Sequence, residues 1–168
     1  MTIAEFDHLS AEEKRPLLHQ CCGSTSWVNN MLTALPAEDL VDLLEIAEEQ
    51  WYACHEPDWR EAFTHHPKIG NIDTLKEKFA STAHFAQGEQ SSVQQASEQT
   101  LQQLAEANQT YESRFGYIFI VCATGKSADE MLQLLHLRLY NNPEVEIQIA
   151  MEEQLKITKL RLEKLFGN

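Results

Sequence analysis

Apolar residues recur at three- and four-residue steps through most of the chain, which is the spacing of one face of an α-helix. The clearest example is residues 40–51, whose apolar positions are Leu40, Leu43, Leu44, Ala47 and Trp51. A second stripe runs from about residue 89 to Phe115, and Gln, Ser and Glu make its opposite face polar. The pattern therefore predicts amphipathic helices that pack by one face on a common core.

Local start and stop signals divide this pattern into separate helices. Capping boxes predict three starts, at residues 10–13, 74–77 and 127–130. We also expect Ser26 to cap a short helix, Pro36 to begin the helix that contains residues 40–51, and residues 58–63 to form another short helix. The last helix should run from about Pro143 to Phe166, and residues 81–88 should form a loop.

One stretch breaks the helical pattern. Residues 117–123 are continuously apolar and partly β-branched, which favours an extended and buried path. We find no repeat at the periods of solenoid proteins and no linker rich in Gly, Pro or Ser. The sequence therefore predicts an all-α, single-domain helical bundle over residues 1–168, crossed by one extended apolar segment at about residues 117–123.

Composition narrows the range of functions. The chain has 168 residues and is 43% hydrophobic, which is enough for a substantial core. It has 26 acidic against 13 basic residues, a net charge of −13. Because this charge repels phosphate backbones and anionic lipids, we expect no nucleic-acid partner and no membrane partner. An apolar run long enough to cross a bilayer is also lacking.

The cysteine pattern suggests a reducing compartment. The four cysteines, Cys21, Cys22, Cys54 and Cys122, include no C-x-x-C pair, and the N-terminus has no secretory hydrophobic region. We therefore expect a cytoplasmic protein with free thiols. These cysteines fall in helical patterns or in the apolar run, which gives weak support for a nucleophilic cysteine.

The most informative local feature is the segment Thr64–Asn71, in which His65 and His66 precede Pro67. Proline fixes its own φ and pushes the preceding residue toward extended geometry, so the loop can aim an imidazole ring. Histidine is also the commonest general acid or base. The alternative is a surface turn whose histidines have no function, and the segment alone does not decide between the two.

Three charged residues elsewhere could serve a site. Arg161 lies on the last predicted helix between Ile157 and Leu165, so we expect its guanidinium to have an anionic partner, unless it only extends its head to solvent. Arg138 poses the same question. Glu89 stands where a loop meets a long helix, where a carboxylate can either compensate the helix dipole or orient His66.

Two other classes of protein remain open on these observations. A helical interaction module would use its apolar stripes for a partner, and the His-Pro loop would be a simple turn. A metal-dependent hydrolase would use His55, His65, His66 and nearby carboxylates. The ligand spacings of known metal motifs are absent, however, and adjacent histidines aim their rings apart, so we predict no metal site.

Four motifs taken together resemble a known family. They are His65-His66-Pro67-Lys68-Ile69-Gly70, Gly88-Glu89-Gln90-Ser91-Ser92, Phe119-Ile120-Val121-Cys122-Ala123 followed by Gly125-Lys126-Ser127, and Leu160-Arg161-Leu162. In this order they resemble 2-oxo-4-hydroxy-4-carboxy-5-ureidoimidazoline (OHCU) decarboxylase, an enzyme family of urate breakdown. The resemblance covers nearly the whole chain, and the histidine loop with the downstream Glu-Gln pair is its most specific part.

This resemblance implies a set of site residues. By position, His66 matches the catalytic histidine, Glu89 the carboxylate beside it and Arg161 the arginine of the final helix. The residues implied to bind substrate are Pro67, Ala86, Gln87, Gly88, Gln90, Phe119, Ile120, Val121, Cys122 and Ala123.

The resemblance also implies the chemistry: a lyase that decarboxylates OHCU stereoselectively to (S)-allantoin, as a homodimer. Loss of carbon dioxide beside a ring carbonyl leaves an electron pair that the carbonyl oxygen can take up, so neither a metal nor an organic cofactor is expected. We expect His66 to exchange the proton, Glu89 to hold the ring of His66 and the ureido group, and Arg161 to orient an anionic or carbonyl group.

Overall fold

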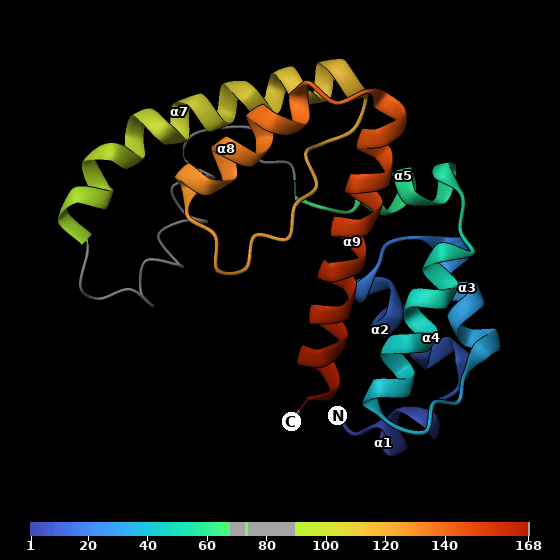
Figure 1. The fold of residues 1–168 in the computed structure, drawn as a ribbon. Coiled ribbons are helices and arrows are strands. Elements are labelled where there is room, and N and C mark those ends of the chain that lie inside the picture. The colour runs from blue at the N-terminus through green and yellow to red at the C-terminus, as the bar shows by residue number, and fades with distance from the viewer. Residues whose placement is uncertain (68–72, 74–89, 168) are drawn as a thin grey trace. The chain divides into compact units, whose positions relative to one another are not determined.

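The computed structural model describes residues 1–67, 73 and 90–167, and only the backbone of residues 90–97. Within these ranges every regular element is an α-helix, which confirms the predicted all-α class (Figure 1). None of the described helices is both long and apolar enough to cross a membrane. Residues 74–77 and 81–88, for which a capping box and a loop are predicted, lie outside the described residues.

The chain contacts group into two compact units. The first unit contains residues 1–66, 120–122 and 147–167, as far as the structure describes the chain. Its helices are α1 (Ile3–Asp7), α2 (Ala11–Cys21), α3 (Thr25–Ala34), α4 (Leu40–Tyr52), α5 (Glu56–Thr64) and most of α9 (Pro143–Phe166). The buried side chains of this unit include Phe6, Leu18, Trp27, Leu43, Trp51 and Leu162.

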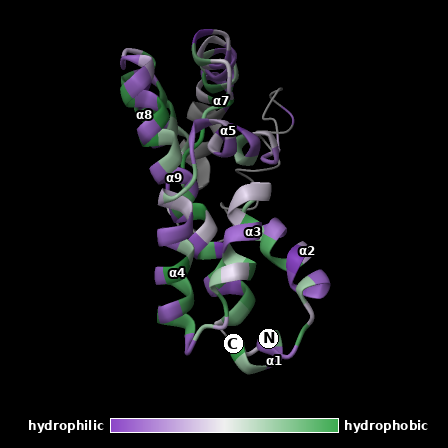
Figure 2. Cartoon of the chain, turned by 90° about the vertical axis from the view of Figure 1, so that its right-hand side faces the viewer, coloured by the Kyte–Doolittle hydropathy of each residue, from purple (hydrophilic) through white to green (hydrophobic). Residues whose placement is uncertain are grey.

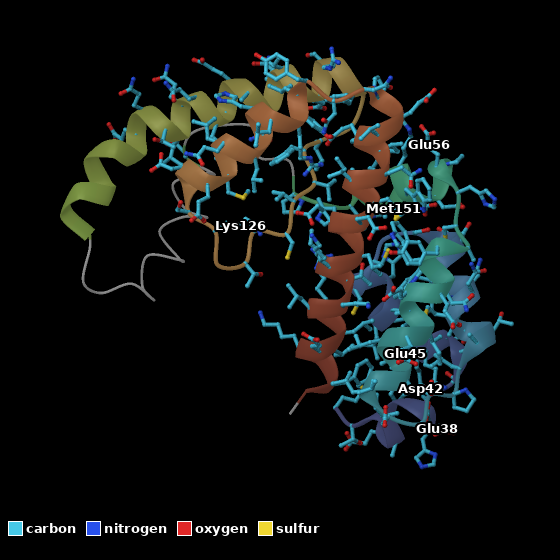
Figure 3. The ribbon with its side chains drawn as sticks, in the orientation of Figure 1. Glu38, Asp42, Glu45, Glu56, Lys126 and Met151 are labelled. Atoms are coloured by element: carbon cyan, nitrogen blue, oxygen red, sulfur yellow. The ribbon has the colours of Figure 1, made fainter. Side chains whose placement is uncertain are left out.

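Helix α9 packs against α4 through polar as well as apolar groups. The indole nitrogen of Trp51 donates to the backbone oxygen of Met151 at 3.0 Å, so the largest apolar side chain of α4 is also hydrogen-bonded. Figure 3 labels Met151 on α9. At the edge of the same interface the hydroxyl of Tyr52 donates to the Glu152 carboxylate at 2.9 Å. Residues of α4 alternate between hydrophobic and hydrophilic along the chain, as its sequence pattern predicts (Figure 2).

Most helix starts agree with the local signals, and two do not. Ser10 caps α2 and Ser127 caps α8, each through a capping box as predicted. The prediction for Ser26 is wrong, because Ser24 accepts the hydrogen bond that caps α3. The prediction for Pro36 is also wrong: α4 begins at Leu40, where the carboxylate of Asp39 accepts from the Asp42 nitrogen. A proline side chain has no acceptor for that role.

The second unit contains residues 67–119 and 123–146 as far as the structure describes them. Helix α7 (Gln90–Phe115) packs along α8 (Ala128–Leu139) (Figure 1). The start of α7 near residue 89 and its end at Phe115 agree with the sequence prediction. Gly116 follows α7 with a φ of 80°, a conformation that glycine adopts without strain, and this explains why the helix ends there.

The apolar segment 117–123 is not helical and forms no strand in the described structure. Its buried side chains are Tyr117, Phe119, Ile120 and Cys122. The segment is therefore non-helical and largely buried, as the sequence predicts. Ile120–Cys122 belong to the first unit, whereas Phe119 and Ala123 belong to the second.

Candidate active site

The two adjacent histidines lie in a turn at the end of α5. The backbone nitrogen of His65 donates to Ala62 O at 3.2 Å, and that of His66 donates to Phe63 O at 3.3 Å. These two bonds span three residues each and form the turn that follows the end of α5 at Thr64, and Pro67 has no N–H to continue the helix. The turn therefore fixes the backbone from which both imidazole rings project.

The His65 ring packs against the end of α2. Its centroid lies 4.7 Å from that of the His19 ring, in an edge-to-face arrangement. A Cβ atom on Gly23 would come within 2.6 Å of His65 Cβ and within 2.5 Å of two ring atoms. Gly23 is therefore needed for this close approach, and it anchors the histidine turn to the segment after α2.

The His66 ring turns instead to α9. Its Nε2 atom is hydrogen-bonded to Oε1 of Gln154, a side chain with no exposed surface. His66 itself is half-buried. The two neighbouring rings thus diverge, as adjacent histidines are predicted to do, and His66 is the one that is held against the long C-terminal helix.

Arg161 shares the face of α9 that holds His66. Gln154, Thr158 and Arg161 are spaced by four and seven residues, so they form one stripe about 10 Å long on the helix. The Nη1 atom of Arg161 donates to the backbone oxygens of Gln20 and Cys21 at 3.4 and 3.3 Å. The anionic partner expected for Arg161 is therefore the negative end of helix α2 in this structure. Nε and Nη2 take no part in these two contacts.

Arg138 has a definite anionic partner, in the second unit. Its Nε and Nη2 atoms lie 2.7 and 2.6 Å from Oε1 of Glu146, and both side chains are buried. The hydroxyl of Tyr111 and the amide of Asn141 also donate to this carboxylate. Burial raises the pKa of Tyr111 far above its ordinary value, so this hydroxyl stays protonated and remains a donor.

The guanidinium of Arg138 also stacks on the apolar segment, with its central carbon 4.5 Å from the ring centroid of Phe119. A cation over an aromatic face is attracted by the ring quadrupole. Arg138 is thus engaged on both sides, by a carboxylate and by an aromatic ring. This arrangement answers the question left open by the sequence and gives Arg138 a structural role in holding Phe119.

Several predicted site residues are not placed by the structure. Glu89, Ala86, Gln87 and Gly88 lie outside the described residues, and of Gln90 only the backbone is described. Pro67 is exposed in the second unit, and Val121 and Ala123 are half-buried. The roles of all these residues in substrate binding stay predictions.

The remaining candidates for other chemistry are the cysteines and the histidines. All four cysteines are free and buried. Burial raises the pKa of the Cys21 and Cys54 thiols to about 11 and that of Cys22 to about 12, so none of these three is a ready nucleophile. In the described part of the chain, no three His, Cys, Asp or Glu side chains group in a way that could hold a metal ion.

Sequence reasoning missed Gln154, Thr158 and Gly23. The first two could have been noticed as polar residues at positions that the apolar pattern of the last helix assigns to the core. Their partner could not be known, because His66 lies 88 residues away from Gln154 in the chain. Gly23 follows the end of α2 and provides room for the His65 ring, which the sequence pattern around it does not indicate.

Comparison with known proteins connects this arrangement to one family. The family model described as OHCU decarboxylase matches residues 7–163. The uric acid degradation bifunctional protein TTL of Arabidopsis thaliana is 40% identical over 151 residues, which are 88% of this chain and 46% of that protein. The 2-oxo-4-hydroxy-4-carboxy-5-ureidoimidazoline decarboxylase of Haloferax volcanii is 28% identical over 103 residues, or 61% of this chain and 58% of that protein.

A solved structure is similar as well. A crystal structure of OHCU decarboxylase in the presence of (S)-allantoin superposes with a TM-score of 0.72 and 38% identity, covering 95% of this chain and 100% of that chain. By contrast, the chain spans only about half the length of the two curated relatives above. The fold is therefore shared over nearly the whole chain, while those relatives contain further sequence.

Proposed function

Because the chain belongs to the OHCU decarboxylase family, we propose that it decarboxylates OHCU stereoselectively to (S)-allantoin in urate degradation. The observation that carries this proposal is the placement of His66. Its ring is held by Gln154 on the same face of α9 that presents Arg161. A titratable imidazole and a guanidinium on one stripe can move a proton and bind an anion in the same site.

The proposed reaction breaks the bond between a ring carbon and the carboxylate. Carbon dioxide leaves, and the electron pair stays in the ring, where neighbouring unsaturated atoms delocalise it. The substrate hydroxyl loses its proton and becomes a carbonyl, and a proton added to one face of a ring carbon sets the configuration. One further proton, taken from solvent by a ring nitrogen, neutralises the negative charge that the departing carbon dioxide leaves behind. His66 is proposed to carry the proton between these positions.

The other residues of the proposed site bind and orient the substrate. Arg161 is placed to attract the carboxylate or a ring carbonyl, because its Nε and Nη2 atoms are outside the two contacts with α2. Glu89 is proposed to orient the His66 ring and accept from the ureido group, with Gln90 as a second polar contact. The backbone of residues 119–123, together with Pro67 and residues 86–88, is proposed to line the substrate site.

We propose that this reaction needs no metal and no organic cofactor. The reason is chemical: the ring itself can delocalise the electron pair released with carbon dioxide, so an external electron sink is unnecessary. Activity should therefore survive dialysis against a strong chelator, with metal content checked by elemental analysis. Activity that is lost on chelation and restored by one added metal would contradict this part of the proposal.

The test of the activity follows the product by circular dichroism. OHCU is generated in place from urate, and the optical signal is recorded with and without the protein. We expect rapid appearance of one allantoin enantiomer, against slow spontaneous decay that gives a racemate without the protein. If the protein leaves both the rate and the stereochemistry unchanged, the proposed activity is wrong.

A matched pair of variants tests the role of His66. His66→Asn removes the titratable ring, and we expect kcat to fall about 100-fold or more with folding retained. His8→Asn makes the same change at an exposed histidine of α1's end and should leave activity unchanged. An active His66→Asn protein would show that the histidine loop does not perform the proton transfer.

We also propose that the protein is a homodimer. Three apolar side chains near the end of α8 and the start of α9 are exposed: Leu137 by 70%, Tyr140 by 88% and Val145 by 52%. A second copy of the chain would cover such a patch. Light scattering should give a dimer mass that Leu137→Lys reduces to a monomer, while Val41→Lys, at an apolar residue of α4 that is 64% exposed, should not.

A cytoplasmic location is proposed from the thiols. Three buried cysteines with raised pKa values remain as thiols rather than disulfides. Free cysteines of this kind persist in reducing compartments. Cell fractionation that recovers the protein in the cytosolic fraction would agree with this location, and recovery from an oxidising compartment would contradict it.

A further inference from the structure

One face of α5 is bonded to the segment that begins α3. The Oε1 atom of Glu61 accepts from the backbone nitrogen of Thr25 at 2.9 Å and also from the Thr25 hydroxyl. Three residues earlier on α5, Oδ1 of Asp58 accepts from the Ser26 hydroxyl at 2.7 Å. Residues three apart lie on the same side of a helix, so both carboxylates bind the start of α3 from one face of α5.

The same contact continues into the histidine turn. His65 follows Glu61 by four residues, and its ring lies directly against Gly23. From its first turn to the turn that follows it, α5 is thus held along residues 23–26. The last of these contacts is made by the residue next to His66, so the seat of α5 on this segment determines where the turn lies.

Glu61 has a particular place in this contact. Thr25 is the first residue of α3, and an N–H group at that position has no acceptor within its own helix. A half-buried carboxylate here also meets the positive end of the helix dipole. Asp58 has a second task, because its Oδ2 atom accepts from the His55 nitrogen and so caps α5 itself. Glu61 therefore gives the cleaner test of the contact between the two helices.

We propose that Glu61 is a positioning residue for His66: by binding Thr25 it fixes α5 against α3, and so places the turn from which the His66 ring reaches Gln154. Every contact of this ring depends on where that backbone lies. A displacement of about 1 Å in a catalytic group can lower a rate about 100-fold. The catalytic part of this inference rests on the proposed function.

The first test needs no activity measurement. The NMR signals of the His66 ring report its surroundings, and His66→Asn identifies them by their loss. Glu61→Ala removes the carboxylate, and we expect these signals and the midpoint of their pH titration to shift. Glu61→Gln keeps an oxygen of the same reach that can accept from both groups of Thr25, so it should restore the signals.

Thr25→Pro breaks the same bond from the other side. Proline has neither the N–H nor the hydroxyl, yet the first position of a helix accepts it. The residue before it, Ser24, already has the extended backbone that proline requires, with φ −94° and ψ 120°. Helix α3 should therefore remain, and the His66 signals should shift as in Glu61→Ala. The double variant should shift them no further, because both changes remove one bond.

The same variants connect the placement of His66 to activity. Well below the unfolding temperature, kcat should fall about 10-fold in Glu61→Ala and in Thr25→Pro, with a smaller change in KM and recovery in Glu61→Gln. A loss of stability alone would leave kcat unchanged under these conditions. The matched control is Glu56→Ala, which removes an exposed carboxylate that pairs with Arg60 along α5 (Figure 3), and it should move neither the signals nor kcat.

Each outcome decides a separate part of the inference. Unchanged His66 signals in both Glu61→Ala and Thr25→Pro would overturn it, and so would an equal shift in Glu56→Ala. If Glu61→Ala does not fold, Thr25→Pro decides the matter. Shifted signals with an unchanged kcat would overturn the catalytic part. A wild-type protein that does not decarboxylate OHCU would instead overturn the proposed function, while the signals would still decide the placement of His66.

Discussion

Each unit contains one buried polar cluster that the structure describes in detail, and the two clusters differ in charge. The cluster of Thr158, Gln154 and His66 is joined by hydrogen bonds and contains no group with a permanent charge. The cluster of Tyr111, Arg138 and Glu146 is built on a buried ion pair. The first orients an imidazole ring through neutral side chains, whereas the second holds two opposite charges in contact.

The difference follows from what each cluster holds. A charged pair in a low-dielectric interior is costly to separate, so it locks the side chains that it contacts, here the Phe119 ring. A neutral chain of hydrogen bonds orients its members at lower electrostatic cost. We therefore expect perturbations of the charged cluster to act mainly on stability and those of the neutral cluster mainly on catalysis.

The largest effect is expected from breaking the ion pair. Arg138→Met leaves the Glu146 carboxylate buried without a cation, and we expect the free energy of unfolding to fall by about 3–5 kcal/mol. Urea titration measures this loss. The double variant Arg138→Met and Glu146→Gln removes both charges and should recover most of it. A double variant as unstable as the single one would mean that the charge left behind is not the cause.

This cluster also shows what the sequence could and could not predict. Arg138 was recognised as a cation among leucines that needed a partner, because that question depends only on neighbouring residues of one helix. Its partner, Glu146, lies beyond the chain reversal at Asn141–Pro143 and could not be chosen from several acidic residues. The ends of α7, α8 and α9 were predictable, since Gly116, Ser127 and Pro143 act locally.

The same distinction applies to the candidate site. His66 could be singled out because Pro67 is its neighbour, and Arg161 because of its apolar surroundings. Gln154 could not, because its role depends on a contact between α5's end and α9. Helix α1 was missed for another reason: its five residues are too few to show a periodicity, although Thr2 and Glu5 form a capping box.

A smaller effect is expected at Gly23, because its substitution would displace the turn that carries His65 and His66. Gly23→Ala places a Cβ against His65 Cβ, and one of the two must shift. We expect a loss of about 1–3 kcal/mol in the free energy of unfolding, together with lower decarboxylase activity because the His66 ring moves with the turn. Adding His65→Gly should relieve the clash and recover stability. A single variant as stable as the wild type would contradict the close packing.

A pH effect of about 1 kcal/mol is expected from Cys22. Burial raises its pKa from about 9 to about 12, so the folded protein binds this proton more tightly than the unfolded chain does. The corresponding stability is fully present below pH 9 and is lost as pH rises from 9 to 12. Between pH 8 and pH 10 the free energy of unfolding should therefore fall by about 1 kcal/mol more in the wild type than in Cys22→Ala. Equal losses in the two proteins would show that this thiol is not the cause.

The smallest effect is expected where an ion pair is exposed. Arg60 Nε lies 2.9 Å from Glu56 Oε1, nearly the same separation as in the buried pair, but the two side chains are 43% and 51% exposed. Water already solvates both charges, so Arg60→Met should change the free energy of unfolding by less than about 0.5 kcal/mol in urea titration. Arg138→Met and Arg60→Met make the same substitution, so the difference between them measures the effect of burial on an ion pair. A loss at Arg60 as large as that at Arg138 would mean that burial does not separate the two pairs.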